Sequence, residues 1–364
     1  MKKNYVIGLM SGTSMDGINA SLVNTDGRTL NRTGYQVISS YSEKTIKLLK
    51  KYVFHYDILK NNISFYEKLS KHISYDNYLA VKKIVNLSGI NPDLIGFHGQ
   101  TVFHDSSKKI SIQLGDGNLL AKLSRTNVIS KFRQNDIKNG GEGAPISPIY
   151  HKLLMKKLKL TLPCCFLNIG GVSNISYWDG SQLLGFDVGP GNGIMDIYCQ
   201  ENLDINFDRD GIIASRGNPN YQIINEFLKL PYFKKTYPKS LDRLEFNFFV
   251  NKLQFSNNNS SDILATFLEF TVHSIIKGIN LLPSQPKIIV VMGGGQHNKY
   301  LLRRIIDSFS FDIVRADEIG VPGDFIEAEM IAYIAARKIN NLPITFPYTT
   351  GVQIPCVGGE INLV

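Results

Sequence analysis

The sequence predicts an α/β fold made of two similar halves, and three observations lead to this class. Strand-like apolar runs alternate with helix-like runs along the chain. The chain falls into two such blocks, and both open with a strand, a glycine-containing turn, a second strand and an Asp-Gly pair. Its 364 residues are enough to build two domains that each bury a hydrophobic core.

The first block begins with strands and continues with helices. Its opening stretch, VIGLMSGTSMDGINASLV, places two apolar runs around a turn rich in hydroxyl groups and glycine. The strands that we expect are Tyr5–Leu9, Ile18–Asn24, Gln36–Ser40, Leu94–Phe97 and Ile110–Leu114. The helices that we expect, from apolar residues at helical spacing, are Glu43–Lys60 and Phe65–Asn86.

The second block repeats this opening. We expect strands over Cys165–Asn168, Ile175–Trp178, Leu183–Phe186 and Lys287–Met292, and helices over Tyr221–Leu228, Asp262–Ile279 and Phe325–Ile339. The Gly170-Gly171 turn and Asp179-Gly180 stand where the first block has its opening turn and Asp26-Gly27, which suggests a duplicated domain. Hairpins of this kind are common, however, so the pair alone leaves a chance similarity equally open.

Composition limits the classes of protein to consider. With 43% hydrophobic and 20% charged residues and no apolar run near the roughly 18 residues of a membrane span, we expect a cytoplasmic globular protein. Cys164, Cys165, Cys199 and Cys356 form neither a disulfide framework nor a zinc-binding pair, so we interpret them as core thiols. The net charge of +9 comes from lysines spread over helical faces, which does not favour a nucleic-acid partner.

Three glycine-rich turns point to a phosphate-containing ligand. The chain has no GxxxxGK[ST] motif and no complete GxGxxG between a strand and a helix, so any nucleotide must be held by other turns. The candidates are the opening turn, Gly185–Asp196 and Val290–Asn298, each of which follows a strand. Glycines let backbone N–H groups approach phosphate oxygens closely, and serine and threonine hydroxyls add donors.

Two carboxylates in these turns are candidates for chemistry. Asp187 stands at the end of an apolar strand, where a carboxylate facing a pocket could act as a general base. The alternative is an aspartate that caps the following turn or helix. Asp16 has the same two interpretations, as a ligand near Mg²⁺ or as a turn former.

Nine segments together resemble the anhydro-N-acetylmuramic acid kinase family, in that family's order along nearly the whole chain. They are GLMSGTSMDGI, IGFHGQTVFH, FRQNDIKNGGEGAP, LNIGGVSNIS, GFDVGPGN, PKS (238–240), MGGGQHN, GVPGDFIEAEMIAY and PYTTG. The resemblance implies the acetate and sugar kinase, Hsp70 and actin superfold, with two duplicated actin-like (ribonuclease H-like) domains flanking an ATP-binding cleft. The domains implied are residues 1–131 plus about 345–364, and residues 132–344.

The resemblance also implies an activity. A water molecule opens the 1,6-anhydro ring of 1,6-anhydro-N-acetylmuramic acid, and O6 receives the γ-phosphoryl group of ATP, giving N-acetylmuramic acid 6-phosphate and ADP. This reaction belongs to peptidoglycan recycling and amino-sugar catabolism. ATP and Mg²⁺ are the implied cofactors and the anhydro sugar is the small-molecule substrate. We expect no nucleic acid and no membrane partner, and a homodimer is left open.

Site residues follow from the matched segments. The resemblance implies that Asp187 and Glu327 are catalytic, with Asp187 activating water, and that Asp16 lies near the metal. The residues implied for the nucleotide are Ser11, Gly12, Thr13, Ser14, Met15, Asp16, Gly17, Gly170, Gly171, Gly189, Gly191, Asn192, Gly293, Gly294, Gly295 and Asn298. Those implied for the sugar are His98, Gln100, Arg133 and Asp136, and His104 could also reach sugar hydroxyls.

These roles have structural alternatives. Glu327 could simply cap its helix, Arg133 could form an interdomain salt bridge, and His98 or His104 could be a hydrogen-bonded structural histidine. The chain also departs from the family at Glu142, where glutamine is usual, and at Leu241-Asp242, where a PPKSTGRE-like run is usual. Another sugar kinase of the same superfold, or a non-catalytic nucleotide-binding module, therefore stays open as an alternative function.

Overall fold

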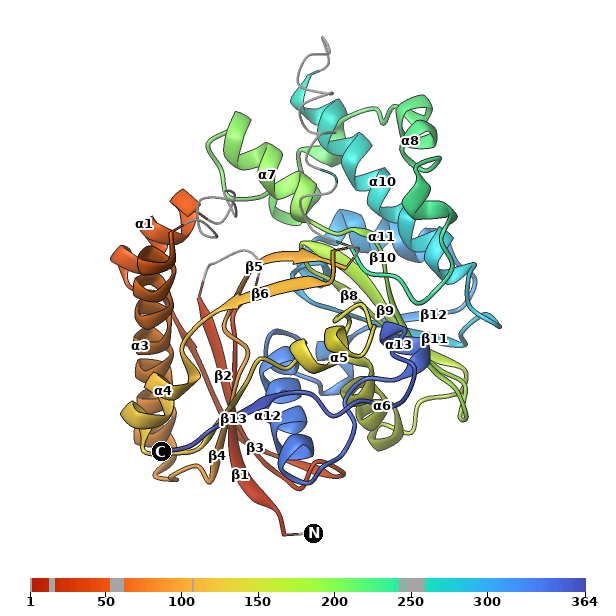
Figure 1. The fold of residues 1–364 in the computed structure, drawn as a ribbon. Helices are drawn as coiled ribbons and strands as arrows, with labels where there is room; N and C mark the ends of the chain where they lie inside the picture. The colour runs from red at the N-terminus through yellow and green to blue at the C-terminus, as the bar shows by residue number, and fades with distance from the viewer. Residues whose placement is uncertain (1, 13–16, 53–61, 107, 242–245, 247–258) are drawn as a thin grey trace. The chain divides into compact units, whose positions relative to one another are not determined.

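In a computed structural model, the chain folds into two compact units. Unit 1 comprises Met1–Leu153 and Asp324–Val364, and unit 2 comprises Leu154–Gly323. The structure describes residues 2–12, 17–52, 62–106, 108–241, 246 and 259–364. Each unit has its own sheet and its own helices (Figure 1).

Unit 1 is built on a six-stranded sheet in the order β13-β7-β4-β1-β2-β3. β1, β2 and β3 are antiparallel neighbours, β4 lies parallel to β1, and β7 lies parallel to β4. The strands are β1 (Asn4–Met10), β2 (Ile18–Thr25), β3 (Leu30–Ser39), β4 (Leu94–Phe97), β7 (Val128–Ser130) and β13 (Glu360–Asn362), with a separate hairpin of β5 (Gln100–Asp105) and β6 (Ile110–Leu114). The helices are α1 (Glu43–Tyr52), α3 (Ile63–Ser88), α4 (Gly117–Ser124), α5 (Gln134–Lys138), α12 (Ile326–Ile339) and α13 (Pro347–Thr350).

Two glycines in the sheet allow α12 to pack closely on unit 1. Gly8 in β1 and Gly96 in β4 are register partners, and a Cβ on either would collide with or crowd a backbone carbonyl oxygen of α12. Figure 1 shows α12 and α3 on opposite sides of these strands. The core under α3 includes Ile7, Ile73 and Phe97, each at most 1% exposed. Because the glycines leave no side chains under it, α12 packs directly on β1 and β4.

Unit 2 is built on a five-stranded sheet in the order β10-β9-β8-β11-β12. Its strands are β8 (Cys164–Ile169), β9 (Val172–Trp178), β10 (Leu183–Pro190), β11 (Ile288–Met292) and β12 (Asp312–Arg315). Its helices are α7 (Gly193–Asn202), α8 (Tyr221–Phe227), α10 (Ser260–Ile279) and α11 (Lys299–Asp307), with 3-10 turns η1 (Arg209–Gly211), η2 (Ala214–Arg216), η3 (Pro231–Lys234), η4 (Gly294–His297) and η5 (Ala316–Ile319). α6 (Pro148–Lys157) and η6 (Gly323–Phe325) include the two points where the chain passes between the units.

The same five-strand arrangement occurs in both units, which confirms the expected duplication. β3-β2-β1-β4-β7 and β10-β9-β8-β11-β12 have the same order and the same pattern of antiparallel and parallel neighbours. The two Asp-Gly turns also match. Burial raises the pKa of Asp26 and Asp179, but hydrogen bonds from residues two and three positions later outweigh it and leave both pKa values below the ordinary one.

The domain boundaries differ from those expected. Residues 132–153 and 324–344 lie in unit 1, although we expected both segments in the second domain. The physical reason for the second segment is α12, which packs on β1, β2 and β4 of unit 1. The helix expected over Glu43–Lys60 is present as α1, and its last residues, 53–60, lie outside the described residues.

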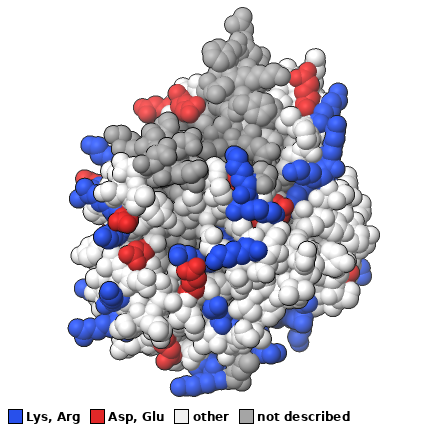
Figure 2. All heavy atoms as spheres, in the orientation of Figure 1, with Lys and Arg blue, Asp and Glu red and all other residues white. Residues whose placement is uncertain are grey.

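Cysteine burial, helix length and surface charge can be compared with the expectations from composition. All four cysteines are free and buried, and burial raises the pKa of Cys164 and Cys199 to about 12, as suits core thiols. None of the helices in the described part of the chain combines the length and the apolar character that crossing a membrane requires. On the face drawn in Figure 2, lysine and arginine side chains are interspersed with acidic and uncharged ones.

Candidate active site

Asp187 lies near the carboxyl end of β10 and is held by backbone contacts. Its side chain is buried, with 6% of the residue exposed, and its N–H donates to the carbonyl oxygen of Lys239 at 3.0 Å. The N–H of Leu241 donates to Asp187 Oδ2 at 2.8 Å, and the Tyr232 hydroxyl donates to the carbonyl oxygen of Asp187 at 2.6 Å. The pairing of β10 with β9 shifts register between Asp187 and Gly189. This bulge sets the direction of the carboxylate at the strand end.

The departure from the family at Leu241 leaves this support intact. The contact to Asp187 comes from the backbone N–H of Leu241, which any residue except proline supplies. The Leu241 side chain instead joins the hydrophobic core of unit 2. Asp242 lies outside the described residues.

Two glycine turns of unit 2 lie directly against each other. The N–H groups of Gly191 and Gly193 donate to the carbonyl oxygen of Gly171 at 3.0 and 3.2 Å, and that of Asn192 donates to Gly170 O at 2.7 Å. A Cβ on Gly191 would collide with the Gly170 carbonyl oxygen, so glycine is required by the close approach of the two backbones. The structure therefore brings together the turn after β8 and the turn after β10.

The third turn, after β11, joins the same group. Gly293 has φ +78 and lies against Asn168 and Ile169 at the end of β8, while Gly294 lies near the amide of Asn192. Because β8, β10 and β11 run in the same direction, all three turns lie at the carboxyl ends of their strands. This edge of an open α/β sheet is where ligands usually bind.

Some polar side chains at these turns form hydrogen bonds within the protein, and others have no partner among the described residues. Asn298 accepts a hydrogen bond from Leu301 N at 3.0 Å and caps α11, so its side-chain oxygen is already occupied. Among the described residues, Asn192 Oδ1 and both amide atoms of Gln296 are buried without a hydrogen-bond partner. A cavity of about 590 Å³, in the size range of small-molecule sites, lies beside η4 and α11 and is lined by Asp210, Gln296, His297, Lys299, Leu302, Arg303, Ile306 and Arg315.

The opening turn of unit 1 is described only at its two ends. Thr13, Ser14, Met15 and Asp16 lie outside the described residues. Ser11 accepts a hydrogen bond from the Tyr41 hydroxyl at 2.6 Å, and Gln100 Nε2 donates to the carbonyl oxygen of Gly12 at 3.0 Å. Gly17, at the other end, is buried close to the Ser39 carbonyl oxygen. The base of the turn is thus fixed from β3, β5 and the segment before α1.

Gln100 differs from the expectation of a sugar contact. It is 0% exposed, its Nε2 donates to Gly12 and Thr101 carbonyl oxygens, and its Oε1 accepts from Tyr41. These contacts occupy the amide, so the structure makes Gln100 a support of the opening turn.

His98 and Arg133 do lie together, as expected for one binding site. Arg133 Nε and Nη2 are 3.4 and 3.3 Å from His98 Nε2, and Arg133 Nη1 donates to the Gly143 carbonyl oxygen at 3.2 Å. His98 Nδ1 is 3.0 Å from Gly99 O, so this nitrogen carries the proton and Nε2 accepts. Burial, together with the nearby Arg133 charge, lowers the pKa of His98 and of His104 to about 3. Both imidazoles are therefore neutral, and Arg133 carries the only charge of the three.

Asp136 is the second residue that differs from its expected role. It is 0% exposed, and its Oδ1 accepts from the hydroxyls of Thr345 at 2.5 Å and Thr350 at 2.6 Å. Its Oδ2 accepts from Gly143 N at 2.8 Å. The carboxylate is thus enclosed by protein donors and holds the loop whose carbonyl oxygen contacts Arg133, instead of facing a sugar.

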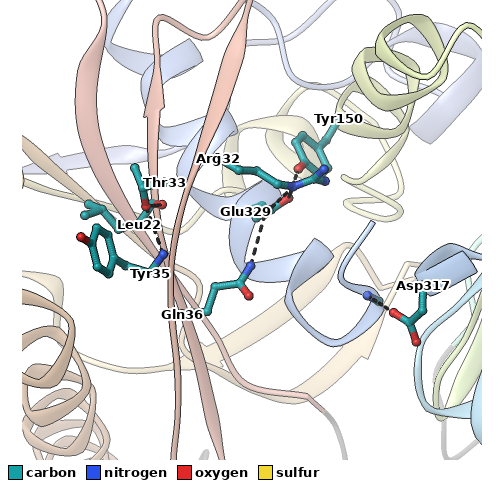
Figure 3. Close-up of polar contacts among 9 residues, drawn as sticks. Leu22, Arg32, Thr33, Tyr35, Gln36, Tyr150, Asp317 and Glu329 are labelled. Atoms are coloured by element: carbon teal, nitrogen blue, oxygen red, sulfur yellow. Dashed lines mark hydrogen bonds and ion pairs between the residues drawn. The ribbon is translucent and has the colours of Figure 1, made fainter. Parts of the chain in front are cut away.

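The two glutamates of α12 have different surroundings. Glu327 lies in the first turn of the helix and is partly exposed. The helix dipole stabilises a carboxylate at this position. Glu329 is 0% exposed and is bound by Arg32 Nε at 2.8 Å and by the Tyr150 hydroxyl at 2.5 Å (Figure 3). Asn19 Nδ2 donates to Asp324 O at 2.7 Å, which ties the segment before α12 to the start of β2. Glu327 is therefore the glutamate that a ligand can reach, and Glu329 is structural.

The described residues can be compared with what a metal site would need. The described residues contain no group of three His, Cys, Asp or Glu side chains that could hold a metal ion. Proteins often bind Mg²⁺ through one or two carboxylates together with waters and substrate phosphates, so a site for it does not require such a group. Asp16, the expected ligand, lies outside the described residues.

Sequence reasoning missed several residues that support the site. Tyr41 and Tyr232 donate to the opening turn and to Asp187, and Thr345 and Thr350 donate to Asp136. The PYTTG segment contained one of these signals, because two hydroxyl residues after a proline are typical of a hydrogen-bonded turn. The PKS segment contained another signal, the charged residue Lys239, which is 4% exposed in the structure.

The family model and the curated relatives agree on one family. The family model described as anhydro-N-acetylmuramic acid kinase matches residues 4–363. Proteins with that name from Brucella anthropi and Pelagibacter ubique are 34% and 36% identical to the chain, cover 99% of it, and are themselves covered over 100% and 99% of their lengths. One from Rhodopseudomonas palustris is 37% identical with 98% coverage of both chains. Component A of (R)-2-hydroxyglutaryl-CoA dehydratase from Acidaminococcus fermentans matches 92% of this chain and 99% of its own with a TM-score of 0.47 and 11% identity.

Proposed function

The chain belongs to the family of anhydro-N-acetylmuramic acid kinases, and on this basis we propose that Asp187 is the general base of its reaction. The enzyme is a phosphotransferase with an alcohol group as acceptor and uses ATP. Its reaction opens 1,6-anhydro-N-acetylmuramic acid and phosphorylates O6, as peptidoglycan recycling requires.

The reaction needs a base beside the anomeric carbon. The oxygen of a water molecule bonds to C1, one water proton passes to Asp187, and the bond from C1 to O6 breaks. O6 takes the γ-phosphoryl group from ATP, and ADP leaves. The observation that supports Asp187 is its buried position at the end of β10, where Leu241 N orients the carboxylate without protonating it.

ATP is assigned to the glycine turns. Gly170, Gly171, Gly191 and Asn192 form one group in unit 2, and Gly293, Gly294 and Gly295 lie against it. Gly189, which lies against Ser274, is assigned with them. The adenosine would use the cavity beside η4 and α11, with Asn298 acting through its cap of α11. In unit 1, Ser11, Gly12 and Gly17 and the four residues between Gly12 and Gly17 are assigned to the phosphates.

The sugar is assigned to residues of unit 1. Arg133, oriented by His98 and Gly143, is a suitable partner for the lactyl carboxylate, because a guanidinium binds a carboxylate through two parallel hydrogen bonds. Glu327 would contact the sugar or its water from the start of α12. Gln100 and Asp136 act indirectly, through the opening turn and the loop at Gly143.

Three further features are proposals that rest on the reaction. Asp16 would help to hold Mg²⁺, and the metal would stabilise negative charge on the transferred group. A cytoplasmic location follows from the use of ATP. A homodimer is proposed as the assembly to test first by light scattering.

The proposed base is tested by turnover in ¹⁸O-water. The protein is incubated with Mg-ATP and 1,6-anhydro-N-acetylmuramic acid, with plain N-acetylmuramic acid as the comparison sugar. We expect label at the anomeric hydroxyl and phosphate on O6, and no turnover of the plain sugar. ADP release that is equal with both sugars would favour an ordinary sugar kinase.

A variant pair isolates the base. Asp187→Asn should lower kcat at least a thousandfold while ATP still binds, since base catalysis and orientation of the water are lost together. Asp312→Asn is the matched control, because Asp312 is an exposed aspartate at the start of β12 in the same unit. Full activity of Asp187→Asn would refute the assignment.

A further inference from the structure

Lys239 is a buried cation that the proposed reaction does not yet use. It is 4% exposed, and its Nζ lies 4.5 Å from the centre of the Tyr232 ring. An ammonium group is strongly hydrated in water, so burying it is unfavourable unless nearby groups stabilise its charge. The ring face of Tyr232 supplies part of that stabilisation. A nearby negative charge would stabilise the buried ammonium further.

The same two residues hold Asp187 through the backbone. Lys239 O accepts from Asp187 N at 3.0 Å, and the Tyr232 hydroxyl donates to Asp187 O at 2.6 Å. Leu241, two positions after Lys239, donates its N–H to Asp187 Oδ2 at 2.8 Å. The Lys239 segment and Tyr232 therefore contact Asp187 at its N–H, at its carbonyl oxygen and at its carboxylate.

We propose that Lys239 is a positioning residue that keeps the Asp187 carboxylate ionised and correctly oriented for the attacking water. The inference rests on the proposed role of Asp187 as the base. Lys239 acts through Asp187 and needs no contact with the sugar. It belongs to the PKS segment, residues 238–240, to which the family resemblance gave no role.

The charges around Lys239 agree with this role. Burial lowers its pKa to about 8, and the positive charges of Lys235 and Lys277 act in the same direction. The Asp187 carboxylate acts in the opposite direction and raises the pKa of Lys239. The interaction is reciprocal, so a protonated Lys239 lowers the pKa of Asp187 and keeps it able to accept a proton at neutral pH. Among the described residues, the Tyr232 ring also faces the ammonium.

The test is the pH profile of kcat/KM for the anhydro sugar. Lys239→Met removes the charge but keeps a long side chain in the core. Without the cation the pKa of the base rises, so the midpoint of the acid limb should move to higher pH, by about one pH unit or more. On the acid limb, kcat/KM of the variant should be about tenfold below that of the parent enzyme for each pH unit that the midpoint moves. At high pH the kcat/KM values of the two enzymes should approach each other. Lys239→Arg should restore most of the original profile.

Two further variants separate charge from structure. Lys235→Met removes an exposed positive charge of the same neighbourhood and should leave the acid limb in place. Tyr232→Phe keeps the ring but removes the hydroxyl that donates to Asp187 O, so kcat should fall by the same factor at every pH. Thermal unfolding of each variant shows whether it is folded, and the Tyr232 variant still tests the orientation of Asp187 if Lys239→Met does not fold.

The outcomes distinguish this inference from the proposed function. If Asp187→Asn is inactive while Lys239→Met changes the rate by one factor at all pH values, Asp187 remains the base and the inference about Lys239 is refuted. A higher KM for ATP in Lys239→Met with an unchanged acid limb also refutes it and would make Lys239 a phosphate ligand. If Asp187→Asn is active, the proposed function itself fails.

Discussion

Asp136→Asn should loosen the loop that supports Arg133. The carboxylate is 0% exposed and accepts hydrogen bonds from Thr345 and Thr350 at Oδ1 and from Gly143 N at Oδ2. The amide of asparagine keeps one carbonyl oxygen for the two threonines. Its NH₂ group then faces the N–H of Gly143, and that buried donor has no acceptor.

The cost follows from these contacts. A buried donor without an acceptor costs about 1–3 kcal/mol, and replacing charged by neutral hydrogen bonds to the threonines costs roughly 1 kcal/mol more. The free energy of unfolding of unit 1 should therefore fall by about 2–4 kcal/mol. In a unit of this size that lowers Tm by about 4–16 °C. Because Gly143 O accepts from Arg133, the KM for the sugar should rise while the KM for ATP stays unchanged.

Thermal unfolding and steady-state kinetics measure the two effects. Thr350→Val is the matched comparison, since it removes one donor and leaves the carboxylate with two. We expect Thr350→Val to lower the free energy of unfolding by about 1 kcal/mol. Combining it with Asp136→Asn should lower the free energy of unfolding by less than the sum of the two single effects. A Tm within 2 °C of the parent for Asp136→Asn, or equal increases of both KM values, would refute the reasoning.

Three further predictions concern burial and close packing. The histidines His98, His104 and His151 have pKa values of about 3 in the folded chain against 6.5 when unfolded. The free energy of unfolding is therefore highest above pH 6.5 and falls as the pH drops toward 3, because the unfolded chain binds the protons first. At pH 5.5 each histidine lowers the free energy of unfolding by about 1.4 kcal/mol. Equal urea midpoints at pH 7.5 and 5.5 would contradict this. Glu329→Gln weakens the buried ion pair with Arg32 and should lower the free energy of unfolding, measured by urea titration, by about 3 kcal/mol. An unchanged free energy of unfolding would contradict this. Gly191→Ala places a methyl group against a carbonyl oxygen of the neighbouring turn and should weaken ATP binding at least tenfold by calorimetry, whereas an unchanged affinity would remove these turns from the nucleotide site.

The opening hairpins could be predicted from the sequence because local chemistry specifies them. Asp26-Gly27 and Asp179-Gly180 each place a carboxylate where it accepts N–H groups two and three residues later, followed by a glycine at positive φ. These contacts lie within four residues, so the sequence pattern contains all the information needed. The glycine turns could be recognised in the same way, but their contacts with one another in unit 2 are long-range.

Residues that act at long range could not be assigned in this way. Asp136 meets Thr345 across 209 positions, and Gln100 meets Gly12 across 88. An aspartate or glutamine in a matched segment has the same appearance whether it faces a ligand or a buried donor. Only the positions of the donors distinguish the two roles, and those positions depend on the tertiary fold.

The domain boundary was wrong for a similar reason. The apolar sequence of α12 indicates that the helix is buried, as most of its residues are, but not which sheet it covers. Gly8 and Gly96 were the available signal, since adjacent strands with glycines in register make room for a helix backbone. Without knowing that β1 and β4 are neighbours, that signal cannot be recognised.

The duplication explains where ligands can approach but not which chemistry occurs there. β3 and β10 occupy equivalent places, yet β3 ends at Ser39, whose hydroxyl accepts from Lys83. β10 instead carries Asp187, which forms hydrogen bonds with Lys239, Leu241 and Tyr232. The turn after β1 likewise carries hydroxyl groups, while the turn after β8 consists of Gly170 and Gly171. The shared strand order thus places turns at equivalent strand ends, but their side chains differ. The proposed chemistry depends on one carboxylate and on the lysine beside it, which is why the pH profile of Lys239→Met is a sharper test of the mechanism than any measurement of the fold.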